Sequence, residues 1–581
     1  MVNNLAHNQE SHFKITFFTN VLIFLVFILM FNPSYAMFRT LFADDASYLS
    51  HGFTIGLDFN FKYKDSNASW VVKDNVPSHP IGPGVLAAPF ITVFSIIDRL
   101  TDNPVIADHH QYLTSWSYFG FVFATFFYFI CGLWLYYFGL KNLNIPLNAK
   151  HYLFIASSYG ILVYVLIRPI LANAFEFFTL ALCFWSCTKW IDSLKEEKVP
   201  YVMTMCCAIS IILTILVRPS NINVFLLPII IFGFTQLTNK QFSHVKYLNK
   251  IGLISIGLLM GWLFGFGLIT ILINQKLYGM YFPSAEALYG LISPSQEALK
   301  PSVITKGAFD FQQFVPLPSI NNYQDFFNAV KTLIIRSPKI VVILFSSEFG
   351  LVYNSTILVV GTISALALIA CQLKTVFWKS FTLISLIAVY TALPIAIILF
   401  WQYAGSIYGY RFIFCIFPIA IMGFAAIYNK LIERYNQFAL FPVMIKMYVS
   451  TFWLLCAFGL IASSFWYLNK NLIDHSGINS FGIFLPHSNS IYYNFIVIFE
   501  MLRLDAWYEM ILTRTIGFYY VGLLEILHIP YEHSDFFKIM SNSNFKIFGC
   551  LYHDLPGRVY VQVTILGALF VGSGIYLSKQ D

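Results

Sequence analysis

The chain has 581 residues, of which 58% are hydrophobic, 18% are aromatic and only 11% are charged. Soluble domains carry roughly 25% charged residues, so the composition excludes an ordinary soluble protein and indicates an all-α polytopic membrane protein. The formal net charge of +7 does not indicate a nucleic-acid partner, because the lysines are dispersed between apolar segments and form no basic run. The nine cysteines lie mostly in apolar segments, in neither a disulfide framework nor a zinc pattern.

About twelve apolar segments are long enough to cross a bilayer, and we expect each to form a transmembrane helix. They lie near residues 15–31, 113–140, 151–167, 174–190, 201–217, 221–236, 251–273, 352–371, 380–400, 411–428, 448–468 and 558–577. Ser34-Tyr35-Ala36 has the small residues of a cleavage site, so residues 1–36 could be a signal peptide. We favour an uncleaved first helix, because its apolar run is longer than a usual signal core.

The distribution of lysine and arginine predicts the topology. Basic residues recur in the polar segments 141–150, 189–200, 237–250, 372–379 and 429–447, which the positive-inside rule assigns to the cytoplasm. An even number of spans then puts both termini in the cytoplasm of a plasma membrane, which we expect to be a bacterial inner membrane. A transmembrane module would cover residues 1–468, with a long first outer loop 32–112 carrying juxtamembrane helices and an outer segment 274–338. The tail 469–557 would also lie outside, and residues 558–581 would hold the final span and a cytoplasmic end.

The first outer loop contains the first candidates for chemistry. Asp44 and Asp45 follow directly on the first apolar run, and His79 opens the turn-rich sequence His-Pro-Ile-Gly-Pro-Gly. Ionisable groups at membrane depth are costly and mark functional sites. Simpler readings exist, since the two aspartates could cap a helix starting near Ala46 and His79 could be an ordinary turn histidine. Neighbouring side chains diverge on a helix or strand, so we expect one carboxylate to act and the other to orient, without a metal pair.

Three arginines are expected at the outer membrane face, where translocated loops are usually poor in Lys and Arg. Arg168 and Arg218 each precede a proline that can open the next helix, and Arg411 follows a Gly- and Tyr-rich segment. They could simply reach lipid phosphates. Together with His79 they fit better with a site for a phosphate group, because guanidinium offers paired donors to its oxygens. Glu176, inside the next apolar run, is costly there unless it is paired or lines a polar cavity.

These motifs, in this order, resemble the membrane glycosyltransferases of superfamily C, in the branch of the protein O-mannosyltransferases and the lipid A aminoarabinose transferases. The resemblance covers residues from about 15 to 430. The family usually has Asp-Glu where this chain has Asp44-Asp45, and a second proline where it has Ile81. The stretches that carry the resemblance are Ala43-Asp44-Asp45-Ala46, His79-Pro80-Ile81-Gly82, Arg218-Pro219-Ser220-Asn221, Glu348-Phe349-Gly350-Leu351 and Gly409-Tyr410-Arg411-Phe412.

The resemblance implies transfer of a sugar from a polyprenyl-phosphate carrier to a lipid, polysaccharide or protein hydroxyl of the cell envelope. Such a reaction needs a base, cations for the departing phosphate, and a groove for the lipid. By the match, Asp44 is the expected base, with Asp45 beside it. No cofactor is expected with certainty, and a divalent metal is compatible with the chemistry but not indicated. The remaining assignments are His79, Arg218 and Arg411 for the donor phosphate, Arg168 and Glu176 as supporting residues, and Tyr278, Tyr281 and Tyr289 for the sugar or acceptor pocket.

Two other functions remain open. A lipid-sugar flippase or transporter would also bind phosphate, but it should show homologous halves or charges deep within its spans. A polymerase or ligase that uses a diphosphate-linked donor would also place arginines outside. The acidic pair directly after the first span favours the monophosphate donor.

Overall fold

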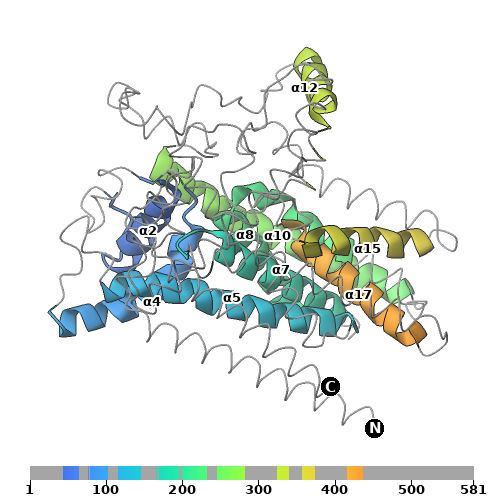
Figure 1. Cartoon of the computed structure of the whole chain (residues 1–581), viewed down its shortest axis with the longest axis horizontal. Helices are drawn as coiled ribbons and strands as arrows, with labels where there is room; N and C mark the ends of the chain where they lie inside the picture. The colour runs from blue at the N-terminus through green and yellow to red at the C-terminus, as the bar shows by residue number, and fades with distance from the viewer. Residues whose placement is uncertain are drawn as a thin grey trace, which may run out of the picture.

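The structure, a computed structural model, describes residues 43–63, 76–77, 79–102, 115–145, 165, 169–194, 199–231, 245–279, 281, 323–338, 340, 344, 356–372 and 415–435. Every regular element in this part of the chain is a helix, which confirms the all-α class. The elements are α2 (Ala43–Gly56), α4 (Gly82–Leu100), α5 (Trp116–Asn142), α7 (Asn173–Ser193), α8 (Tyr201–Val217), the 3-10 helix η6 (Pro219–Leu226), α10 (Val245–Tyr278), α12 (Tyr323–Arg336), α15 (Thr356–Gln372) and α17 (Phe417–Tyr435) (Figure 1).

Three of the described helices are long and apolar enough to cross a membrane, which is compatible with a membrane protein. Two of them, α5 and residues Ile251–Tyr278 of α10, match expected spans. Helix α8 coincides with the expected span 201–217 but belongs with the shorter apolar helices, as do parts of α15 and α17. Helix α7 coincides with the expected span 174–190, but it is not among the three described helices that are long and apolar enough to cross a membrane. Most of the other expected spans lie outside the described residues.

The third candidate span, α4, lies inside the expected first outer loop 32–112, for which we expected juxtamembrane helices. Its sequence begins Gly-Pro-Gly and contains Pro89 within the helix. Proline is tolerated in the first turn, where its missing N–H has no helical partner. Helix α10 also continues to Tyr278, so this residue ends a helix and does not open the outer segment.

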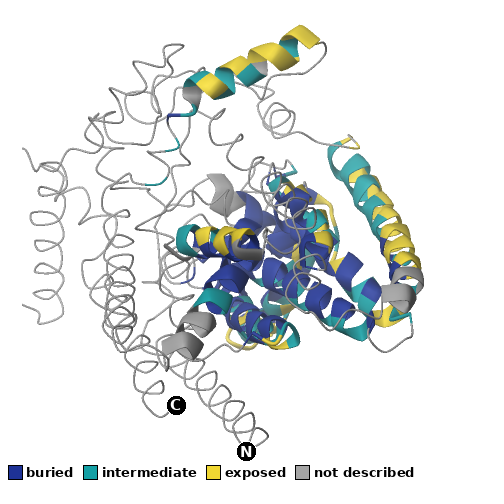
Figure 2. Ribbon diagram, turned by 90° about the vertical axis from the view of Figure 1, so that its right-hand side faces the viewer, coloured by how far each residue is buried: buried dark blue, intermediate teal, exposed yellow. Residues whose placement is uncertain are grey.

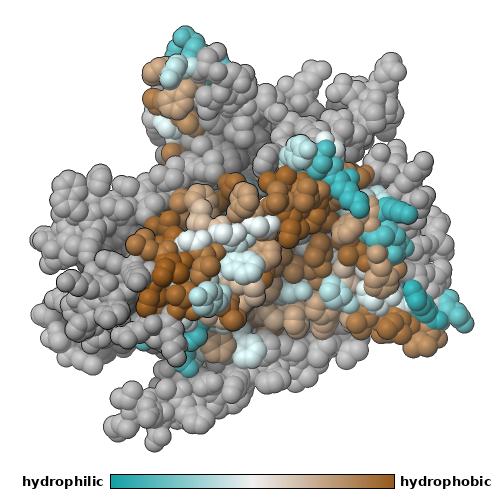
Figure 3. All heavy atoms as spheres, turned by 180° about the vertical axis from the view of Figure 1, so that it is seen from behind, coloured by the Kyte–Doolittle hydropathy of each residue, from teal (hydrophilic) through white to brown (hydrophobic). Residues whose placement is uncertain are grey.

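Aromatic rings and glycines pack the centre of the bundle. The Tyr136 ring of α5 meets Phe177 at 5.2 Å and Phe184 at 5.7 Å between centroids, both on α7. Phe417 of α17 joins the same cluster at 5.4 Å from Tyr136. Gly361 of α15 touches the backbone of α17, because small residues let apolar helices approach closely. Figure 2 shows buried residues gathered in one block, with exposed residues along helices at its edges, and Figure 3 shows a largely hydrophobic described surface.

Helices α2, α4 and the first turns of α5 form a second packed group at one end of the bundle. The buried Asp98 carboxylate accepts hydrogen bonds from the Trp116 and Ser117 backbone N–H groups, at 2.8 and 2.7 Å, and from the Ser117 hydroxyl at 2.6 Å. These bonds satisfy donors that the start of α5 would otherwise leave unpaired. Thr92 of α4 donates to the Gly56 carbonyl at the end of α2 at 2.6 Å. The end of α4 is therefore fixed to the start of α5, and α2 lies against α4.

Candidate functional site

The acidic pair belongs to the first turn of α2. This helix begins at Ala43, so residues 44 and 45 lie inside it and do not precede it as N-caps. Carboxylates in a first turn still favour the positive end of the helix dipole. The side chains of Asp44 and Asp45 lie outside the described part of the structure. The backbone nevertheless places positions 44, 48 and 51 on one face of α2, because they follow the i, i+4, i+7 spacing.

That face of α2 meets the predicted His79 turn. The Tyr48 and His79 rings lie edge to face with centroids 5.4 Å apart. His51 Nε2 lies 2.9 Å from the backbone carbonyl oxygen of His79, and this bond is buried. His79 itself is 9% exposed. The structure therefore brings the histidine turn against the helix that carries the acidic pair.

His51 and Tyr63 were not predicted as site residues. His51 Nδ1 lies 2.6 Å from the Tyr63 hydroxyl oxygen, and the two rings meet edge to face at 5.3 Å. Burial lowers the pKa of His51 to about 4 and raises the pKa of Tyr63 well above its usual value. Tyr278 at the end of α10 is close enough to contribute to the Tyr63 shift. The i, i+4, i+7 recurrence of Asp44, Tyr48 and His51 is the sequence signal that could have identified His51.

The His79 turn also touches the end of α8. A Cβ atom on Gly82 would lie 2.5 Å from the Val217 backbone nitrogen, so only glycine permits this approach. Arg218, the next residue, leaves α8 with extended backbone angles (φ −150°, ψ 105°), and Pro219 opens η6. The predicted change of direction at Arg-Pro is therefore present, and it brings the backbone of Arg218 close to the turn that carries His79.

Glu176 and Arg218 form a buried ion pair. Arg218 Nη1 donates to Glu176 Oε2 at 2.6 Å, with side-chain exposures of 8% and 0%. Asn221 Nδ2 donates to the other carboxylate oxygen, Oε1, at 2.8 Å. Glu176 was expected to be paired or to line a polar cavity, and the structure shows it paired; Asn221 is a partner that we did not predict. Both carboxylate oxygens are engaged, so Glu176 of α7 is bonded to Arg218 through one oxygen and to Asn221 of η6 through the other.

Polar groups from other helices surround this pair. Tyr136 of α5 is near enough to interact electrostatically with Glu176, and Cys415 lies close to Glu176, Arg218 and the Asn223 side chain. Asn173, one turn before Glu176, is fully buried, and neither atom of its amide has a hydrogen-bond partner. The Tyr136 hydroxyl is likewise buried without a partner. Unpartnered buried polar atoms are costly, so this centre is suited to accept water or another polar group.

Only some of the other predicted site residues lie in the described part of the structure. Tyr278 lies beside the His51–Tyr63 pair, whereas Tyr281 is 58% exposed. Arg168, Tyr289 and Arg411 lie outside the described residues, although Pro169 is described and its carbonyl accepts a hydrogen bond from Thr125 of α5. No group of three or more His, Cys, Asp or Glu residues that could hold a metal ion occurs within the described ranges.

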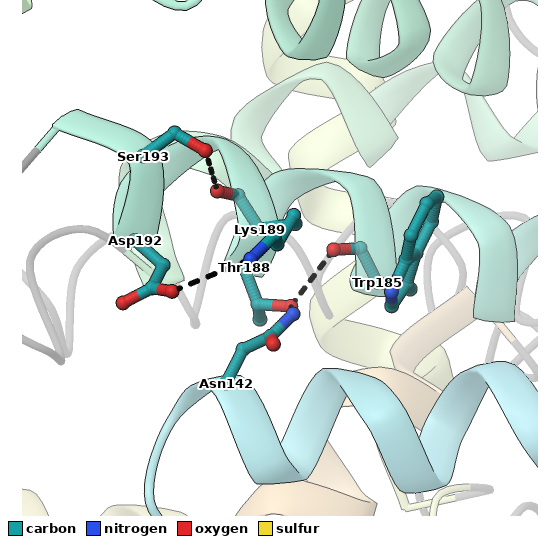
Figure 4. A network of polar contacts seen from close by, with 6 residues as sticks. All are labelled: Asn142, Trp185, Thr188, Lys189, Asp192 and Ser193. Atoms are coloured by element: carbon teal, nitrogen blue, oxygen red, sulfur yellow. Dashed lines mark hydrogen bonds and ion pairs between the residues drawn. The ribbon is translucent and has the colours of Figure 1, made fainter. Parts of the chain in front are cut away.

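The C-terminal end of α7 carries a second ion pair, which is exposed to solvent. There Asn142 of α5 donates to the Thr188 hydroxyl at 3.2 Å, and Lys189 pairs with Asp192 at 3.7 Å (Figure 4). The Lys189 and Asp192 side chains are 43% and 35% exposed, so this ion pair is solvated. The buried pair and the solvated pair thus lie at opposite ends of one helix, which makes the second a natural control for the first.

The comparisons with known proteins provide no family assignment. No model of a known protein family matches the chain, and no curated protein matches it significantly.

Proposed function

We propose that this chain is a membrane glycosyltransferase that moves a sugar from a polyprenyl-phosphate carrier to a cell-envelope acceptor on the outer face of the membrane. The observation that supports it is the convergence at one end of the bundle. The face of α2 that includes position 44 packs on the His79 turn, and that turn contacts the residue before Arg218. A base, an imidazole and a guanidinium are the groups that such a transfer needs. The first two positions belong to α2 and the His79 turn, and the backbone that leads into Arg218 lies against the same turn.

In the proposed reaction the acceptor hydroxyl gives its proton to Asp44 while its oxygen forms a bond to the anomeric carbon. The bond from that carbon to the phosphate oxygen breaks, and the electron pair leaves with the polyprenyl phosphate. Cationic donors at the phosphate stabilise the negative charge as it develops. His79 and Arg218 are assigned to this task, with Arg411 as a further donor. Glu176 orients Arg218 by accepting its hydrogen bond, and Asn221 fixes the Glu176 carboxylate by donating to its other oxygen.

A lipid-sugar flippase is the second candidate, because the Glu176–Arg218 pair is a charged pair buried among helices. Charged pairs of this kind also line transport pathways. Purified protein supplied with synthetic polyprenyl-phosphate sugars, matching diphosphate-linked sugars and a set of hydroxyl acceptors separates the candidates. Transfer from the monophosphate donor alone supports the proposal. Transfer only from the diphosphate donor indicates a polymerase or ligase, and movement of intact donor across vesicles without transfer indicates a flippase.

A further inference from the structure

His51 has no part in the reaction described above, yet both nitrogens of its ring are engaged in buried hydrogen bonds. Its ring is wholly buried, and each ring nitrogen has one hydrogen-bond partner. The two partners come from different segments, Tyr63 at the end of the stretch that follows α2 and His79 in the turn before α4. Fifteen residues of the first loop separate Tyr63 from His79, so His51 joins two separate parts of that loop to α2.

The chemistry of the partners determines the form of the ring. The His79 carbonyl oxygen can only accept, so His51 Nε2 carries the hydrogen and donates it. A neutral imidazole with its hydrogen on Nε2 has a lone pair on Nδ1, so Nδ1 accepts from the Tyr63 hydroxyl. The ring is therefore a neutral Nε2–H tautomer that donates to one segment and accepts from another. Such a linker is directional, because the opposite tautomer would face the His79 carbonyl oxygen with a lone pair, although the Tyr63 hydroxyl could then accept instead of donate.

The backbone around His51 shows why this position matters for the rest of the site. Gly84 at the start of α4 packs directly on the His51 Cβ atom, and Gly82 packs on Val217. The start of α4, and with it the His79 turn that leads into it, is therefore packed between α2 and the end of α8. We infer that His51 is a positioning residue, which holds the His79 turn on α2 through Nε2 and the Tyr63 segment through Nδ1, and so sets the distance from α2 to Arg218. Its effect on sugar transfer rests on the proposed function, but its effect on the turn does not.

Two substitutions separate the two bonds. In His51→Gln the side-chain amide nitrogen reaches the position of Nε2, so the bond to the His79 carbonyl is kept and the acceptor for Tyr63 is lost. In His51→Asn the side-chain oxygen replaces Nδ1, so the bond from Tyr63 is kept and the His79 carbonyl loses its donor. Tyr63→Phe is the matched control, because it removes one hydroxyl and leaves the ring in place.

Hydrogen exchange of the full-length protein in detergent provides a readout that is independent of any activity. We expect His51→Asn to raise amide exchange in a peptide covering residues 79–85 by roughly tenfold to a hundredfold, because a buried carbonyl is left unpaired. His51→Gln and Tyr63→Phe should keep that peptide at wild-type protection and raise exchange near residues 57–63. Equal protection of residues 79–85 in His51→Asn and wild type, or equal loss in both His51 variants, would overturn the inference.

Two further measurements keep the inference independent of variant folding and of the proposed function. Nitrogen chemical shifts of labelled histidine in the wild-type protein should show a neutral Nε2–H ring, and an Nδ1–H ring contradicts the inference without any variant. In the transfer assay the kcat/KM of the His51→Asn variant should fall along with the amide protection of residues 79–85. The kcat/KM of the His51→Gln variant should stay at the wild-type value. If the exchange results follow expectation and the wild type transfers no sugar, then the proposed function fails and the role of His51 stands.

Discussion

Glu176→Gln is the substitution whose effect the structure predicts most directly. The Glu176 carboxylate is fully buried and accepts from Arg218 at 2.6 Å and from Asn221 at 2.8 Å. Glutamine has the same shape, but only one of its two terminal atoms can accept a hydrogen bond. If its oxygen stays with Asn221, its amide group faces the guanidinium donor to donor, and Arg218 loses the carboxylate of this buried ion pair.

The size of the effect follows from burial. Breaking a buried ion pair by removing one partner costs about 3 to 5 kcal/mol, because the remaining charge is left uncompensated. The same change in an exposed pair costs less than about 1 kcal/mol. Asp192→Asn removes the acidic partner of Lys189 at the other end of the same helix, where the two side chains are 43% and 35% exposed. It is therefore the matched control within α7.

Thermal unfolding of the purified protein in one detergent measures both variants against wild type. We expect Glu176→Gln to lower the midpoint by several degrees and Asp192→Asn to leave it nearly unchanged. The double variant Glu176→Gln/Arg218→Met should recover part of the loss, since it removes the uncompensated charge together with its former partner. A Glu176→Gln protein that is as stable as Asp192→Asn would refute the reasoning, because the pair would then be solvated or unimportant to the packing.

Three further predictions follow from the same contacts. Arg218→Lys should reduce transfer about tenfold to a hundredfold in the donor assay, because lysine keeps the charge but loses the planar paired donors. Turnover close to wild type would indicate that Arg218 has no contact with the donor phosphate. Asp98→Ala should lower the unfolding free energy by roughly 1 to 3 kcal/mol, since the start of α5 loses its acceptor for Trp116 and Ser117, and unchanged unfolding would contradict the capping role. His51 has its pKa lowered from 6.5 to about 4, so the native state binds fewer protons than the unfolded state between these values. Stability should therefore be complete above about pH 7 and fall by about 3 kcal/mol as the pH decreases from 6.5 to 4, whereas a His51→Gln protein should lack this component of the pH dependence.

Sequence reasoning located the helices best where one continuous apolar run ends at a defined break. Helix α8 covers the expected residues because its apolar run stops at Arg218-Pro219, where proline prevents continuation. It also predicted that Glu176 is either paired or lines a polar cavity, because an isolated charge in an apolar helix is too costly, and the structure shows the paired case. It expected juxtamembrane helices in the first outer loop without giving their bounds, and α4 is a helix of this segment with Pro83 in its first turn.

The partners of the site residues were harder to predict, because they depend on contacts between distant segments. Nothing local indicates that Asn221 bonds to Glu176, which lies 45 residues away, or that His51 donates to His79, 28 residues away. Asp98 was not singled out in the sequence, because its role as the acceptor for α5 depends on the packing of α4 and α5 together. Sequence motifs identified the segments of interest, and the structure showed which of the described ones touch and through which side chains.

The central claim is that the end of the bundle formed by α2, the His79 turn and Arg218 is a transferase site with Asp44 as its base. Its most direct test is the release of polyprenyl phosphate by purified wild-type protein and by the Asp44→Asn and Asp45→Asn variants, with donor binding measured in parallel. A base acts in the transition state, so Asp44→Asn should abolish release while expression and donor affinity stay close to wild type. Loss in Asp45→Asn alone would assign the base to the neighbouring residue, and full release by both variants would contradict the catalytic role of this site.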